Sequence, residues 1–126
     1  MSDLTLEANG GGFQAKATLN DSTLSIVFSG SGDLNAIELL ADYLKRVHEA
    51  ATARTISLGH CDFRQLAFMN SSCFKSFVVW IDTVKNAAAP YKIVFLTDPN
   101  LHWQRRSLEA LRRLAVSIVT IEIAQS

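Results

Sequence analysis

The sequence predicts an α/β protein with a mixed β-sheet, an N-terminal antiparallel meander and helices packed mainly on one face. Three observations support this fold class. In the first third of the chain, three segments alternate apolar and polar residues, which is the periodicity of strands. The apolar spacing then changes to that of an amphipathic helix. Helical and strand patterns alternate in the remainder, and this order favours a mixed sheet covered by helices.

The meander is predicted from three short segments joined by turn residues. Turns are indicated by the triple glycine at 10–12 and by the pair Asn20-Asp21, because glycine, asparagine and aspartate favour turn conformations. The alternating apolar positions of the three strands are Leu4 and Leu6, then Phe13, Ala15 and Ala17, then Leu24, Ile26 and Phe28.

The first helix and the strand after it follow the meander. Asp33 or Asn35 can cap the helix start, and the next strand is expected over Thr55–Phe63, with a short loop carrying Leu66, Phe68 and Met69. The helix places one set of residues on a single face: Ile37, Leu40, Ala41, Leu44, Val47 and His48.

Two more helices and two more strands complete the chain. Residues 93–96 form a continuous apolar run, which predicts a central strand covered on both faces. Asp98 followed by Pro99 predicts the start of the last helix. In the second helix, five apolar residues are expected to lie on one face: Phe74, Phe77, Val78, Ile81 and Val84. The last helix and the closing strand contribute Leu101, Leu108, Leu111, Ala115, Val116, Ile118, Ile121 and Ile123.

The composition describes one globular domain over residues 1–126. Hydrophobic residues make up 48% of the chain and charged residues 19%, which argues against disorder. Twelve basic and twelve acidic side chains cancel, so net charge gives no reason to expect nucleic acid or anionic membrane as a partner. No signal peptide or membrane-length apolar run is present, which predicts a cytoplasmic protein. Cys61 and Cys73 are expected to be free thiols, with no metal or cofactor.

The most informative segment lies between Asp62 and Ser72. The polar step Asn70-Ser71-Ser72 separates two apolar segments and is expected to open a helix, where unpaired N–H groups and the helix dipole favour anions. Either Asn70 or Ser71 simply caps the helix, or a serine here is a phosphorylation site whose phosphate the helix start stabilises.

This segment resembles the signature of the STAS domain family, the fold of bacterial anti-sigma factor antagonists that regulate transcription by partner switching. The spacing, the apolar positions and the double serine match the signature, and residues 27–33 resemble the family's strand and Gly-x-x-Asp turn. Three positions depart from the pattern: Asn70 replaces an aspartate, Cys73 a glycine, and Arg64 a small hydroxyl residue.

The resemblance implies a regulatory phosphoprotein in signal transduction. The sequence shows no convincing acid–base set, which favours a binding module over an enzyme. It implies an anti-sigma-type serine kinase as partner, with a phosphatase that reverses the modification. Ser71 matches the phosphoacceptor and Ser72 its capping neighbour. Gly30 and Asp33 match the turn that meets the partner, so the expected partner-binding residues are Gly30, Asp33, Asn70, Ser71 and Ser72.

The sequence also allows other functions. An unswitched structural module of a larger signalling assembly is the main alternative, and the departures at Asn70 and Cys73 favour it. A redox role for Cys73 is a third possibility, because a helix start can lower a thiol pKa. His60 and Cys61 are neighbours on a strand, so they point to opposite faces and cannot form a catalytic pair.

The last helix carries an arginine face that is either solvated or a docking surface for an acidic partner: Arg105, Arg106, Arg112 and Arg113.

Overall fold

A six-stranded mixed sheet is backed on one face by three helices in the computed structural model, which describes residues 3–123. The elements in chain order are β1 (Leu4–Gly10), β2 (Phe13–Asn20), β3 (Thr23–Gly32), the short 3₁₀ helix η1 (Leu34–Ala36), α1 (Ile37–Ala53), β4 (Leu58–Met69), α2 (Ser71–Lys85), β5 (Lys92–Thr97), α3 (His102–Leu114) and β6 (Val119–Ile123).

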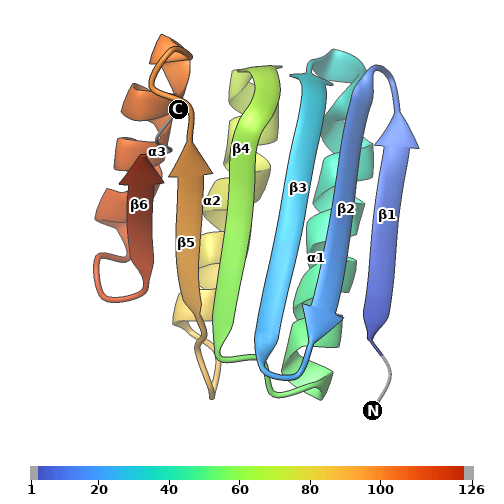
Figure 1. The fold of residues 1–126 in the computed structure, drawn as a ribbon, viewed down its shortest axis with the longest axis vertical. Coiled ribbons are helices and arrows are strands. Elements are labelled where there is room, and N and C mark those ends of the chain that lie inside the picture. The colour runs from blue at the N-terminus through green and yellow to red at the C-terminus, as the bar shows by residue number, and fades with distance from the viewer. Residues whose placement is uncertain (1–2, 124–126) are drawn as a thin grey trace.

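The strands lie in the sheet in the order in which they occur in the sequence. β1, β2 and β3 pair antiparallel, whereas β3 to β6 pair parallel. Each parallel pair is joined by a helix, and α1, α2 and α3 all lie behind the sheet in Figure 1. This arrangement confirms the predicted fold class, including the antiparallel meander and the helices on one side. No helix among residues 3–123 is long and apolar enough to cross a membrane.

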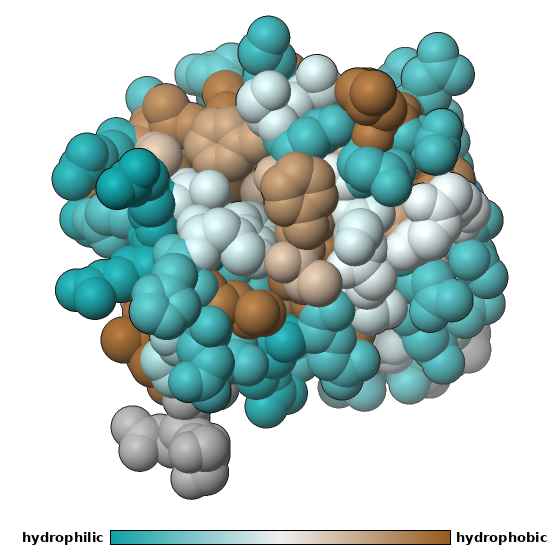
Figure 2. All heavy atoms as spheres, turned by 90° about the horizontal axis from the view of Figure 1, so that it is seen from above, coloured by the Kyte–Doolittle hydropathy of each residue, from teal (hydrophilic) through white to brown (hydrophobic). Residues whose placement is uncertain are grey.

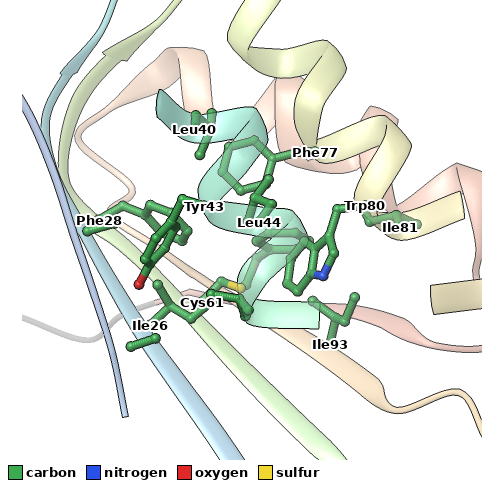
Figure 3. Close-up of a cluster of buried hydrophobic side chains, with 14 of the residues drawn as sticks. Ile26, Phe28, Leu40, Tyr43, Leu44, Cys61, Phe77, Trp80, Ile81 and Ile93 are labelled. Carbon is green, nitrogen blue, oxygen red and sulfur yellow. The ribbon is translucent and has the colours of Figure 1, made fainter. Parts of the chain in front are cut away.

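The core lies between the helical layer and the inner face of the sheet. Its centre is a set of phenylalanine rings in edge-to-face contact, a geometry that aromatic pairs prefer. The Phe63 ring lies 5.3 Å from the rings of Phe28, Phe77 and Phe95, measured between centroids. Trp80 does not belong to the predicted face of the second helix, but it is buried in this core beside Phe77 (Figure 3).

β4 begins later and ends later than predicted. Thr55 adopts a positive φ of 58° in the turn after α1, so the strand starts only at Leu58. The strand then continues through Leu66, Phe68 and Met69, which were expected in a loop. The reason is its partner: β3 also continues, with two register shifts, and pairs with β4 as far as Met69.

The start of α3 also differs from the prediction. Asp98 and Pro99 precede the helix, which begins only at His102. The Asp98 carboxylate accepts a hydrogen bond from the Asn100 N–H at 2.9 Å, and the Asp98 carbonyl accepts one from Leu101 N–H at 3.0 Å. Aspartate therefore closes a local turn here, which competes with its use as a helix cap.

Four further apolar positions are more exposed than expected. Val94 and Leu96 are only half-buried, because helices cover a single face of the sheet and leave the outer face open. Val116 lies before β6 and is 66% exposed. Ala41 is exposed on α1 and does not join the core.

Candidate functional site

The two segments predicted to form the site meet at one edge of the sheet. β3 and β4 are parallel neighbours, so their C-terminal ends lie side by side. The Asn70 N–H donates to the carbonyl of Gly32 at 2.7 Å, and the Cys73 thiol lies 3.5 Å from the carbonyl of Asp33. The fold therefore brings residues 30–33 and 70–72 together, although about 40 positions separate them in the chain.

Asn70 is the cap of α2, and neither serine is. Its side-chain oxygen accepts a hydrogen bond from the Cys73 N–H at 2.9 Å, which satisfies one of the unpaired donors of the helix start. Ser71 is the first residue of α2 and is exposed, whereas Ser72 is half-buried. Because Asn70 supplies the cap, the Ser71 hydroxyl is not needed for it and faces solvent.

Replacing Asn70 with alanine is expected to lower the free energy of unfolding by about 1 kcal/mol, because the Cys73 N–H loses its side-chain acceptor. Asn70→Asp is the matched control and should keep full stability, since aspartate caps equally well and its charge favours the helix dipole. Urea unfolding followed by tryptophan fluorescence measures both variants. Equal stability of Asn70→Ala and the wild type would contradict the capping role.

Gly30 and Asp33 hold the shape of the β3 end. Gly30 was expected in a turn but lies within β3, with a positive φ of 84°. A side-chain carbon there would sit 2.0 Å from the carbonyl oxygen of Gly12, so only glycine fits. Asp33 caps η1 by accepting the Asn35 N–H at 3.0 Å. The local structure therefore explains why glycine stands at position 30 and aspartate at position 33. Contact of these two residues with a partner stays a prediction.

Two exposed apolar side chains belong to the same end of the sheet as Ser71. Leu34 on η1 is 75% exposed, and Phe68 near the end of β4 is 49% exposed. Figure 2 looks onto this end of the molecule and shows hydrophobic side chains standing among hydrophilic ones. A contiguous exposed apolar patch rimmed by polar residues is typical of protein interaction sites. We call the surface formed by Leu34, Phe68 and Ser71 the docking edge.

Neither cysteine has the surroundings of a reactive thiol. Cys73 is buried, and its burial raises the pKa of the thiol, which opposes the lowered pKa that the helix start suggested. Cys61 is buried on the inner face of the sheet and burial raises its pKa as well, while His60 lies half-exposed on the other face. A reactive thiolate requires the reverse: access and a lowered pKa.

The charged positions near the site form local pairs. Arg64, one of the departures from the STAS pattern, holds the Asp62 carboxylate with two side-chain hydrogen bonds of 3.0 and 2.8 Å. These hydrogen bonds lower the pKa of Asp62. On α3, Arg112 pairs with Glu109, whereas Arg105, Arg106 and Arg113 are exposed.

Comparisons with known proteins identify the fold. Of the solved structures, SiaC of Pseudomonas aeruginosa is similar, with a TM-score of 0.66 and 20% identity over 98% of this chain and 100% of that chain. The crystal structure of the diguanylate cyclase SiaD in complex with its activator SiaC, from the same organism, also contains a similar chain. Its TM-score is 0.66 at 18% identity, over 94% of this chain and 99% of that one. The sequence matches no protein-family model and no curated protein, so the likeness to the STAS family stays a resemblance.

These comparisons correct one prediction. An anti-sigma-type serine kinase and an opposing phosphatase were expected as partners, and this expectation is wrong: a structural neighbour solved with a partner is bound to a diguanylate cyclase. The expectation rested on a short motif, and one fold can present its surfaces to unrelated partners.

Proposed function

We propose that this protein is a regulatory protein-interaction module and not an enzyme, and that it binds and activates a diguanylate cyclase. The observation that carries the proposal is the docking edge, where Leu34 and Phe68 are exposed beside the polar helix start at Ser71. The likeness of fold to SiaC, an activator of the cyclase SiaD, supports the choice of partner class. Leucine and phenylalanine side chains gain free energy when a partner covers them.

The proposal includes a switch at Ser71. A phosphoryl group there adds about −1.5 to −2 charge at neutral pH. The helix start tolerates this charge within the domain, but a partner that covers the docking edge must desolvate it. Lys75 follows Ser71 by one helical turn on the same side of α2. A phosphate would engage this lysine and remove its charge from the surface. Modification therefore releases the partner and leaves the fold intact.

The unswitched structural module is the second candidate, and the capping geometry is what favours it. Asn70 caps the helix and Cys73 is buried beneath it, so the helix start needs no modification for its stability. The two candidates share the docking edge and differ only in whether Ser71 controls it.

The first test is direct binding. The diguanylate cyclases of the organism that makes this chain are purified one at a time and titrated with it, with calorimetry as the readout. We expect one of them to bind saturably, and we expect Leu34→Asp with Phe68→Asp to weaken that binding. Absence of binding to every cyclase would refute the proposed partner class.

A further inference from the structure

A second surface outside the docking edge is formed by α1 and α2. An open groove of about 570 Å³ lies between the solvent-facing sides of the two helices. Leu44 from α1 and Trp80 from α2 form its floor and lie close together in the core (Figure 3). Ala41 and Ser76 are small, so the groove stays hollow at the positions where larger side chains would fill it.

The groove is mainly apolar and includes a conspicuously exposed side chain. Val79 on α2 is 65% exposed and forms part of the wall. It does not contribute to the core face of α2, which is formed by other positions such as Phe77 and Ile81. An exposed valine beside a tryptophan floor offers apolar area that a bound segment would remove from water.

The walls of the groove favour a helix as occupant. Both walls are helices, whose backbone N–H and C=O groups are already paired within each helix. An extended segment would find no strand edge here and would leave its own backbone groups unpaired, whereas a helix pairs them internally. The wall from Ala41 to Glu49 rises about 12 Å, which matches roughly two turns of a partner helix.

The charged residues that line the groove indicate which residues should stand on either side of the apolar stripe of that helix. Lys45 stands on the α1 wall and Lys75 on the α2 wall, and neither forms an ion pair with any residue in the described range 3–123. The one acidic residue of the lining, Glu49, comes a full turn after Lys45 on the same wall. Two ammonium groups, one on each wall and neither in an ion pair among the described residues, complement carboxylates on either side of an apolar stripe.

We propose that this groove binds an amphipathic helix of the partner protein, with an apolar stripe facing Leu44 and Trp80 and acidic residues facing Lys45 and Lys75. This inference rests on the proposed function, because it takes the helix to belong to the diguanylate cyclase. Lys75 lies one turn from Ser71, so the groove continues from the docking edge, and one partner can occupy both.

The test uses two synthetic helical peptides of about 16 residues. Both carry the same leucine stripe, and they differ only in having glutamate or lysine at the flanking positions. Amide shifts of the labelled protein report where each peptide binds. We expect the glutamate peptide to bind at least about tenfold more tightly than the lysine peptide. Its shifts should fall on residues 41–49 and 75–83. Equal affinities, no binding of the glutamate peptide, or shifts elsewhere would each overturn the proposal.

Val116 provides a matched control for the groove. It is also a valine and is 66% exposed, but it lies between α3 and β6. Val79→Arg should weaken binding of the glutamate peptide by about tenfold or more, and Val116→Arg should change it less than about twofold. Val79→Arg should also weaken binding of the cyclase. If the cyclase binds Val79→Arg normally, or if Val79→Arg instead dissociates a dimer of this chain, the groove is not the helix site. The proposed function would then still stand on the docking edge.

Discussion

Replacing Gln104 with leucine should lower the free energy of unfolding by about 3–5 kcal/mol, because it leaves several buried polar groups without partners. The Gln104 side chain is fully buried in α3. Its amide nitrogen donates to the carbonyls of Phe63 and Leu66, the latter at 3.0 Å. Its oxygen accepts from the Thr97 hydroxyl at 2.7 Å and from the Asp98 N–H at 3.1 Å.

Arg105 is the control for this prediction. It follows Gln104 on the same helix but is exposed, so Arg105→Leu should change stability by less than about 0.5 kcal/mol. Gln104→Glu keeps the size and the acceptors but places a carboxylate against two carbonyls, and it should also destabilise the protein. Urea unfolding measures all three variants. A loss below about 1 kcal/mol for Gln104→Leu would show that the network contributes little.

Gln104 also matters for the candidate site. β5 pairs with β4 only as far as Asp62, so within residues 3–123 the end of β4 has β3 on one side and no strand on the other. The Gln104 side chain satisfies two carbonyls on that unpaired side. It thereby holds the strand that carries Phe68 and leads to Ser71.

Local patterns predicted the fold class because each strand and helix has its own periodicity. The meander, the three helices and the sheet were recognisable from alternating or helical apolar spacing. The end of β4 was not, because it is a strand only through its pairing with a bulged β3 that lies far away in sequence. Local sequence contains no signal for such pairing.

The start of α3 illustrates a different difficulty. Asp98 and Pro99 are good helix-start residues, but the same aspartate can close a turn. The structure uses it for the turn, and the buried Gln104 fixes the choice by accepting the Asp98 N–H. The available signal in the sequence was Gln104, a single polar residue within the apolar face of α3.

The candidate site was predictable in part. The motif identified Asn70 and Ser71, and the structure places Ser71 exposed at the first residue of α2. The exposure of Leu34 and the groove beside Val79 were not predicted. Both depend on which elements pack against α1 and α2, and sequence periodicity tells only which face of a helix is apolar.

The second large effect is expected at Ser71. Ser71→Asp should weaken binding of the cyclase by about 100-fold, equivalent to about 2.7 kcal/mol. The carboxylate must be desolvated when the partner covers the docking edge, while the helix dipole stabilises it in the free protein by about 0.3–1 kcal/mol. The variant should therefore fold normally and bind poorly.

Neutral substitutions separate charge from size. Ser71→Asn has nearly the shape of Ser71→Asp without its charge, and Ser71→Ala removes the hydroxyl. Both should retain binding within about threefold, because neither adds a group that is expensive to desolvate. The Asn70 cap is present in all of these variants, so the helix start itself should not change.

The most direct test of the switch at Ser71 is a calorimetric titration of the cyclase with the wild type, Ser71→Asn and Ser71→Asp, with the rate of cyclic di-GMP synthesis measured in the same samples. We predict that the wild type and Ser71→Asn bind and stimulate the cyclase, and that Ser71→Asp does neither. Equal binding and equal stimulation by all three proteins would contradict the switch and leave Ser71 as an ordinary residue of a helix start.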